Sequence, residues 1–187
     1  MKRHINVVWL VLVACIMGLL VAFPGWLSKE SIASFISQLG PMSLLGYLLV
    51  SLFRALLLFP VTPFILAGAI LFPQLPFLVL TISVIGVVVG AYLVYSFPSF
   101  GAYDQILEGK YPEKIGLLKQ KMQSRYAFWF VVGWSFFPLV PTDVVCYVAG
   151  LAKMPFRKMI TALLIGELPL VTIYVFVGAE LGEWLLL

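Results

Sequence analysis

One stretch of this chain limits its fold more than any other: residues 41–98 contain a single charged side chain, Arg54. This run is far longer than the about 20 apolar residues that one helix needs to cross a bilayer. Over the whole chain 63% of the residues are hydrophobic and 11% charged, whereas a soluble domain carries about 25% charged residues. The sequence therefore predicts an all-α integral membrane protein, built as a single transmembrane domain over residues 1–187.

Prolines and glycines divide the apolar stretch. Pro60 and Pro63 are followed by Gly68, and then by Pro73 and Pro76. A proline inside a helix removes a backbone hydrogen bond and clashes with the preceding turn, so one continuous helix is excluded. The pattern predicts a re-entrant hairpin over 42–72 and then a full span: arm 42–59, break 60–63, return arm 64–72 and span 77–98.

The second half of the chain repeats this punctuation. Residues 137–141 match residues 59–63 as Phe-Pro-x-x-Pro, and an Ala-Gly pair follows in each half. Interrupted apolar segments at corresponding places in two halves indicate the binding site of a transporter. We therefore expect a second arm and re-entrant hairpin over 126–152. The residues that break the two hairpins are Pro60, Pro63 and Gly68 in the first, and Pro138, Pro141 and Gly150 in the second.

The N-terminal part begins with a basic segment, and residues 5–27 carry no charge. This pattern fits a retained first span with a cytoplasmic N-terminus better than a cleaved signal peptide, because no small-residue cleavage site follows. Residues 28–40 are mixed, with apolar side chains at helical spacing. They fit either a short interfacial helix that begins with Ser28 as N-cap or an ordinary external loop.

The remaining charges suggest an orientation. Residues 99–125 hold five basic and three acidic side chains, as expected of a cytoplasmic loop, and Pro112 is expected to open a helix through about residue 123. A last span is predicted over 159–182. With the N-terminus inside, the first hairpin then enters from outside and the second from the cytoplasm. The prediction is an inverted repeat with two opposed re-entrant hairpins packed among transmembrane helices.

Such hairpins have chemical consequences. Backbone N–H and C=O groups left unpaired in hydrocarbon cost several kcal/mol each, so a break survives only inside protein or beside water. Helix N-termini exposed at a break carry partial positive charge and free N–H donors, which suit a phosphate group. We therefore expect a polar cavity near the middle of the membrane, between the two breaks.

Three charged side chains are expected at depth, where a lone charge costs about 2.5–3.5 kcal/mol and marks a functional candidate. Arg54 suits bidentate phosphate binding or snorkelling to the interface. Asp143 suits the cavity or an N-cap. Glu167, two residues before Pro169, suits proton coupling, or a pairing with Arg54 or a broken hairpin. The candidates are Arg54, Thr62, Ser135, Thr142 and Asp143 for substrate binding, and Asp143 and Glu167 for proton coupling.

Other chemistry finds little support in the sequence. Serines and threonines occur without a His or Lys base nearby, so no enzyme is predicted. Cys15 and Cys146 lie in apolar runs and His4 is the sole histidine, so we expect no metal site and no cofactor. A formal charge of +4 is too small to indicate nucleic acid as a partner.

The second half carries an ordered set of motifs: Phe-Pro-Leu-Val-Pro-Thr-Asp ending at Asp143, then Tyr-Val-Ala-Gly-Leu around Gly150, then Gly-Glu-Leu-Pro ending at Pro169. With the first-half prolines, these motifs resemble the DedA/VTT superfamily, also called the SNARE-associated Golgi protein family, over roughly residues 45–182. The small bacterial branch related to the yeast Tvp-type proteins is the most similar.

This resemblance implies two opposed re-entrant hairpins and a role in lipid translocation, of undecaprenyl phosphate or of phospholipids such as phosphatidylethanolamine. Eukaryotic relatives behave as scramblases, and tolerance phenotypes of some members imply proton coupling. The chain departs from the family pattern at Ser135, where many relatives carry Arg, and at Pro73, which replaces a Gly. Its charges are also reversed relative to the better-known branch, with Arg54 in the first hairpin and Asp143 in the second.

The sequence thus favours a lipid transporter or scramblase, multi-pass in a bacterial inner (plasma) membrane, with membrane lipids as partners. Two alternatives stay open: a proton- or cation-coupled carrier of a small solute, and a non-catalytic membrane assembly factor. The Gly86-x-x-x-Gly90 pair allows close approach of two helices, and a homo-oligomer also stays open.

Overall fold

The computed structural model describes residues 28–54, 59–100, 103–137 and 140–177, together with the isolated positions 11, 15, 18 and 25. Within these ranges every regular element is a helix, which confirms the all-α prediction. Most of the predicted first span, the break residue Pro138 and the end of the predicted last span lie outside the described residues.

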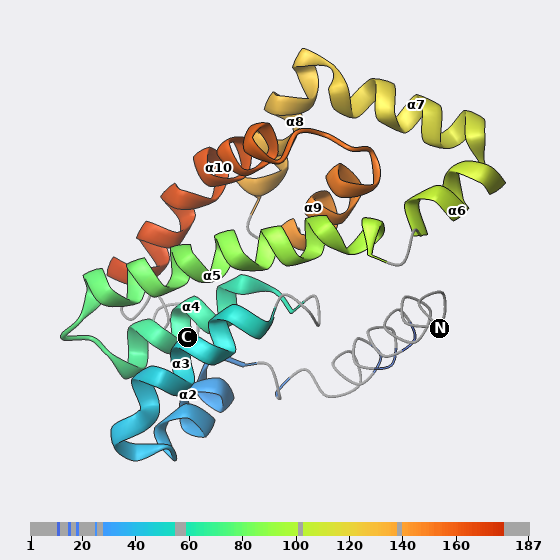
Figure 1. Cartoon of the computed structure of the whole chain (residues 1–187). Helices are drawn as coiled ribbons and strands as arrows, with labels where there is room; N and C mark the ends of the chain where they lie inside the picture. The colour runs from blue at the N-terminus through green and yellow to red at the C-terminus, as the bar shows by residue number, and fades with distance from the viewer. Residues whose placement is uncertain are drawn as a thin grey trace.

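The elements follow one another as short and long helices (Figure 1). In chain order they are α2 (Lys29–Ser37), the 3-10 turn η2 (Gly40–Met42), α3 (Ser43–Phe53), α4 (Val61–Leu71), α5 (Pro76–Ser96), the 3-10 turn η4 (Phe97–Ser99), α6 (Tyr103–Lys110), α7 (Pro112–Gln123), α8 (Arg125–Ser135), α9 (Thr142–Leu151) and α10 (Phe156–Phe176).

Two units of the same design make up most of the fold. Each has a short helix, a connecting segment, a second short helix and a 21-residue helix: α3, α4 and α5 in the first unit, and α8, α9 and α10 in the second. The connecting segments, residues 54–60 and 136–141, are called the first and second break below. At 1.5 Å per residue, the 10- and 11-residue helices are about 16 Å long and the long helices about 31 Å. Both long helices are apolar and long enough to cross a bilayer, and they run in opposite senses (Figure 1).

The two units pack reciprocally. The first short helix of each unit lies against its own long helix, α3 on α5 and α8 on α10. The second short helix lies against the long helix of the other unit, α4 on α10 and α9 on α5. This exchange brings the start of α4 and the start of α9 to one shared cavity, which α10 also lines.

A glycine permits the closest crossing in each unit. Gly86 and Gly166 each lie ten residues after the start of their long helix. A Cβ built on Gly86 would lie 2.9 Å from the carbonyl oxygen of Ser51 in α3, and one built on Gly166 would overlap the carbonyl oxygen of Val132 in α8. Gly86 therefore packs against α3 of the same chain, so the Gly86-x-x-x-Gly90 pair does not indicate a surface for a second copy.

The breaks differ from the expected ones. Pro60 is the N-cap of α4, and Pro63 lies in the first turn of that helix instead of in the break. Proline is tolerated in a first turn because the N–H that it lacks would have no intrahelical acceptor there. In the second unit Pro141 is the N-cap of α9. Pro60 and Pro141 are thus structural counterparts, although the sequence repeat matches Pro60 to Pro138. α3 ends at Phe53, within the predicted arm over 42–59, and residues 55–58 of that arm lie outside the described residues.

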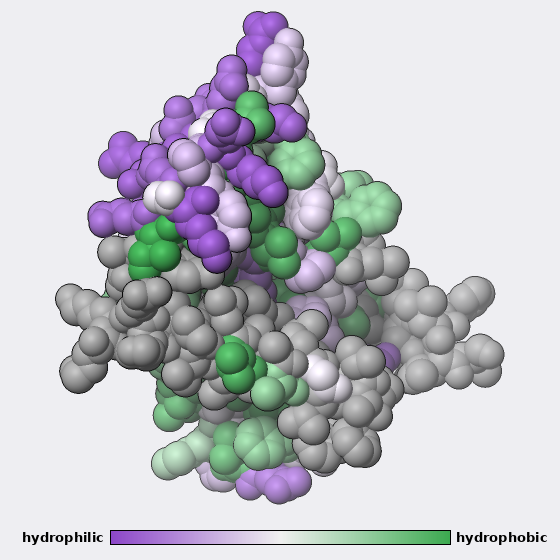
Figure 2. Space-filling model, turned by 90° about the vertical axis from the view of Figure 1, so that its right-hand side faces the viewer, coloured by the Kyte–Doolittle hydropathy of each residue, from purple (hydrophilic) through white to green (hydrophobic). Residues whose placement is uncertain are grey.

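Polar helices cover the ends of the apolar bundle. α7 begins at Pro112 and ends at Gln123, as predicted. Hydrophilic side chains gather at one end of the molecule, over α6 and α7, with apolar side chains adjoining them (Figure 2). Near the other end Ser28 caps α2, accepting a hydrogen bond from the N–H of Ser31 at 3.1 Å, and α2 packs against α4. Residues 29–37 are thus a helix and not an irregular loop.

Candidate functional site

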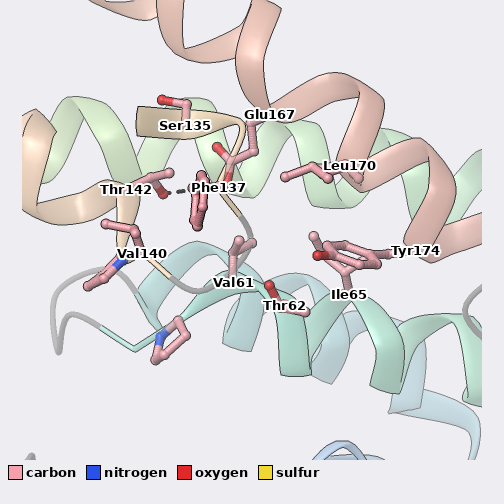
Figure 3. A pocket seen from close by; sticks show the side chains of 13 residues that line it. Val61, Thr62, Ile65, Ser135, Phe137, Val140, Thr142, Glu167, Leu170 and Tyr174 are labelled. Carbon is pink, nitrogen blue, oxygen red and sulfur yellow. Dashed lines mark hydrogen bonds between the residues drawn. The ribbon is translucent and has the colours of Figure 1, made fainter. Parts of the chain in front are cut away.

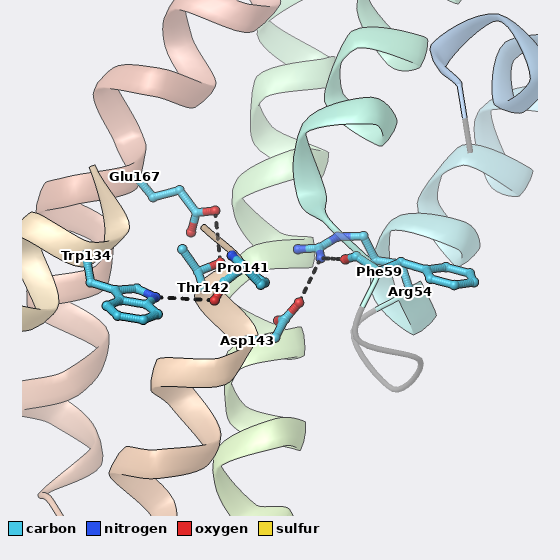
Figure 4. Close-up of polar contacts among 7 residues, drawn as sticks. All are labelled: Arg54, Phe59, Trp134, Pro141, Thr142, Asp143 and Glu167. Atoms are coloured by element: carbon cyan, nitrogen blue, oxygen red, sulfur yellow. Dashed lines mark hydrogen bonds and ion pairs between the residues drawn. The ribbon is translucent and has the colours of Figure 1, made fainter. Parts of the chain in front are cut away.

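An ion pair joins the two breaks. Arg54 follows the last turn of α3, and Asp143 lies in the first turn of α9. Nη1 of Arg54 lies 3.5 Å from Oδ2 of Asp143 and donates a hydrogen bond of 2.8 Å to the carbonyl oxygen of Phe59 (Figure 4). The two side chains are only 3% and 6% exposed. Arg54 therefore links the two units: it donates to the carbonyl oxygen of Phe59 in the first break and to the carboxylate of Asp143 just after the second.

Two alternative interpretations of these residues are wrong in this structure. Arg54 does not snorkel to a surface, because it is buried within the protein. Asp143 is not the N-cap of α9, since Pro141 holds that position and no side chain caps the helix. Asp143 is instead held by Arg54, which supplies a charge-assisted hydrogen bond in the protein interior.

Glu167 extends the polar site on the side of α10. Its Oε1 atom accepts a hydrogen bond of 3.4 Å from the hydroxyl of Thr142, at the start of α9 (Figure 4). Its Oε2 atom is buried and has no hydrogen-bond partner within the described ranges. Glu167 is thus bonded to the second break, one of the pairings expected from the sequence, and keeps one oxygen free to bind something else.

A small cavity lies between the breaks and α10. Its walls come from residues 60–62 and 65, from 135, 137 and 140–142, and from α10, including Glu167 (Figure 3). Its volume is about 50 Å³, enough for one or a few water molecules, each of which needs roughly 10–15 Å³ measured in the same way. The predicted residues Thr62, Ser135 and Thr142 all line this cavity with Glu167.

The buried charges between the two units do not balance, although of these only Glu167 lines the cavity itself. Arg54 is the sole buried cation in the described ranges, against the buried carboxyl groups of Asp143, Glu167 and the distant Asp104. Asp104 is paired with Lys153, so the site between the breaks has one cation and two carboxyl groups. Buried charge is costly unless it is compensated, and the site is therefore suited to accept one more positive charge, as a proton or a bound cation.

Other predicted residues have packing roles. Ser135 ends α8 and lies against Gly166; its buried hydroxyl has no hydrogen-bond partner among the described residues. A Cβ on Gly68 would overlap the ring of Tyr47, and one on Gly150 would overlap the carbonyl oxygen of Tyr95. The Ala-Gly part of the repeat thus marks close helix contacts away from the cavity.

Some contributors to the site were not found from the sequence. Leu170 and Tyr174 line the cavity from α10, three and seven residues after Glu167, and the Tyr174 hydroxyl points toward Thr62 (Figure 3). Residues spaced by three and seven share one helix face, so this spacing was the available signal. Trp134 also supports the second break, donating from Nε1 to the carbonyl oxygen of Pro141 at 3.3 Å (Figure 4).

Comparison with known proteins gives one match. A family model described as the VTT domain matches residues 59–180, a range that contains both prolines Pro60 and Pro141, both long helices and Glu167. No curated protein and no solved structure matches the chain. In the described part of the chain, no group of three or more His, Cys, Asp or Glu side chains is placed to bind a metal ion.

Proposed function

Because the chain belongs to the VTT-domain family, the DedA/SNARE-associated family that its motifs resemble, we propose that it moves a phosphate-bearing lipid across the bilayer between its two breaks. The family is membrane-associated and is generally linked to transport or lipid handling. The lipid class proposed here is undecaprenyl phosphate or a phospholipid. The Arg54–Asp143 ion pair carries the proposal, since it sets a phosphate-binding side chain between the breaks.

The proposed topology is an inverted pair of re-entrant hairpins, α3–α4 and α8–α9. Its support is dimensional: helices of about 16 Å reach halfway through a hydrocarbon core of about 30 Å. The reciprocal packing on α5 and α10 provides a second argument, because each unit covers the other in the same way and the two long helices run in opposite senses (Figure 1). The basic groups of the α6–α7 end favour placing that end in the cytoplasm of a bacterial inner membrane, with the N-terminus on the same side.

In the proposed mechanism, a phosphate replaces Asp143 as the partner of Arg54. Guanidinium groups bind phosphate through two parallel hydrogen bonds, and Thr62 and Thr142 supply hydroxyl groups nearby. The cavity of about 50 Å³ is too small for a lipid head group. Entry therefore requires the two breaks to separate, which exposes Arg54, while the acyl or prenyl tails stay in the surrounding lipid. Glu167 would accept the coupling proton.

The test is lipid flipping in liposomes that contain the purified protein. The comparison uses Arg54→Gln and Arg54→Lys, with Lys119→Gln as a matched loss of a cation whose partly exposed pair with Glu108 lies outside the site. We expect at least tenfold slower flipping for Arg54→Gln, partial activity for Arg54→Lys and unchanged activity for Lys119→Gln. Equal flipping by folded Arg54→Gln protein would remove Arg54 from the mechanism.

One observation favours a second candidate, a proton- or cation-coupled carrier of a small solute. The cavity is water-sized and bordered by an unpaired carboxylate oxygen of Glu167, as a site for a small ion would be. The same liposomes separate the two candidates. A carrier of this kind would leave lipid flipping at the protein-free rate while it passes an ion or solute. Neither candidate involves an enzymatic reaction.

A further inference from the structure

A second hollow is separate from the cavity between the breaks and shares no lining residue with it. It is a groove of about 470 Å³ at the corner where α7 meets α8, within the size range of small-molecule sites. Its walls are almost wholly apolar, and Val148 of α9 closes one side. The other apolar lining residues are Leu118, Met122, Tyr126, Ala127 and Phe130. Water finds few hydrogen-bond partners on these walls, so the groove favours an apolar chain as its occupant.

Three basic residues adjoin Ser124 at the same corner. Lys121 lines the groove, and its carbonyl oxygen accepts a hydrogen bond from the hydroxyl of Ser124 at 2.7 Å. Arg125 is the next residue, and its guanidinium lies over the ring of Tyr126, which lines the groove, and donates to the Tyr126 hydroxyl at 3.0 Å. Lys158 of α10 donates from Nζ to the carbonyl oxygen of Ser124 at 2.8 Å.

None of these three cations is ion-paired within the described ranges, where the four ion pairs involve Lys29, Arg54, Lys119 and Lys153. The contrast with Lys119 is direct, since that lysine lies on the same helix and contacts Glu108 at 2.6 Å. An anion supplied from outside the chain would balance the charge at Ser124.

The groove also lies where the surface changes character. α7 belongs to the hydrophilic end of the molecule (Figure 2). α8 is apolar, and Tyr126, Trp129 and Phe130 are exposed on it. Aromatic side chains with an amphipathic character favour the boundary between head groups and acyl chains. A ligand in this groove would thus have its polar part at Ser124 and its apolar part along Phe130.

We propose that the groove binds one anionic phospholipid of the surrounding leaflet. Its phosphate lies between Lys121 and Arg125, and one acyl chain fills the space between α7, α8 and Val148. Basic pockets beside membrane helices bind anionic head groups in this way. The apolar walls exclude free phosphate as the main ligand, because it would leave the groove empty. This site does not depend on the proposed transport function, since it shares no residue with the cavity between the breaks.

The experiment measures lipid binding by native mass spectrometry of the purified full chain, with dioleoyl phosphatidylglycerol and dioleoyl phosphatidylcholine as probes. The test variant is Lys121→Gln/Arg125→Gln. The control, Lys110→Gln/Lys114→Gln, removes the same charge from the same end of the molecule, beside Tyr111. Each interfacial cation contributes about fivefold in affinity, so we expect roughly 25-fold weaker phosphatidylglycerol binding in the test variant and little change in the control.

Three further measurements distinguish a specific lipid site from a general attraction between charges. Wild-type protein should prefer phosphatidylglycerol to phosphatidylcholine, and glycerol phosphate, which has the anion without the chains, should not displace the lipid. Val148→Phe, which fills the groove without removing a charge, should also weaken binding. The proposal is overturned if both double variants lose binding equally, if phosphatidylcholine binds as well, or if glycerol phosphate competes. Since the readout is binding alone, loss of flipping in Arg54→Gln leaves this result unaffected.

Discussion

Nη1 of Arg54 lies 3.5 Å from Oδ2 of Asp143, although 89 residues separate them in the chain, and the contact is buried. A buried pair of this kind is weak support for stability as a whole, because desolvation offsets most of the attraction between the charges. Replacing only one of the two residues is strongly destabilising, because the remaining charge is then buried in an apolar interior without its partner. Losing one partner of the Arg54–Asp143 pair should therefore lower the free energy of unfolding more than losing both.

This relationship predicts a non-additive pair of substitutions. Arg54→Met or Asp143→Leu alone should destabilise the protein by about 3–5 kcal/mol, whereas the double variant should lose far less or nothing. Thermal unfolding in detergent measures the three variants, and Lys119→Met at the partly exposed pair with Glu108 should cost under about 1 kcal/mol. Additive losses at Arg54 and Asp143 would mean that they act independently.

The close crossing of α8 and α10 gives a steric prediction. Gly166→Ala places a methyl group on the carbonyl oxygen of Val132, and we expect a loss of about 1–3 kcal/mol from overpacking. Gly133→Ala in α8 is the matched control, because a Cβ there meets nothing within 4 Å and alanine favours the helix. Similar unfolding temperatures for the two variants would contradict the crossing.

A buried hydroxyl pair holds α3 on α5. Tyr47 and Ser83 are joined by a hydrogen bond of 2.9 Å and are 0% and 3% exposed. Tyr47→Phe should cost about 1–3 kcal/mol because it leaves the Ser83 hydroxyl buried without that partner. Ser83→Ala added to Tyr47→Phe removes the orphaned group and should recover part of the loss, as measured by chemical unfolding; a further loss of equal size would contradict the pairing.

Glu167 gives a prediction about coupling. Glu167→Gln keeps the shape of the side chain and an acceptor for Thr142, but it cannot exchange a proton. If Glu167 carries the coupling proton, flipping in liposomes should no longer respond to an imposed pH difference, while flipping without a gradient continues. Glu113→Gln, on the exposed face of α7, should respond as the wild type does. An unchanged response in Glu167→Gln would assign the coupling to another group.

Some of this architecture could be predicted because it follows from local rules. Apolar length and proline spacing predicted helices separated by breaks, and the location of Pro112 predicted the start of α7. The register of the breaks could not be predicted in the same way, since proline fits both an N-cap and a first helical turn. Pro60 and Pro63 are two residues of one motif with these two different roles.

The contacts within the site could not be predicted from local sequence patterns. Arg54, Asp143 and Glu167 were candidates because charge is expensive in an apolar setting, yet nothing in a single sequence pairs residues 89 positions apart. Only the reciprocal packing of α4 on α10 and of α9 on α5 decides that Arg54 contacts Asp143 while Glu167 contacts Thr142. Gly166 was noted as part of a motif, but its role against Val132 requires the crossing to be known.

The exchange of short helices between the two units also constrains how the protein is made. When the ribosome has released α4, the long helix α10 that will cover it has not yet been synthesised. Asp143, the carboxyl partner of Arg54, belongs to α9 and is also synthesised later, so the first break has no opposing surface until both helices follow. The packing of α4 is therefore complete only after the second unit has been synthesised.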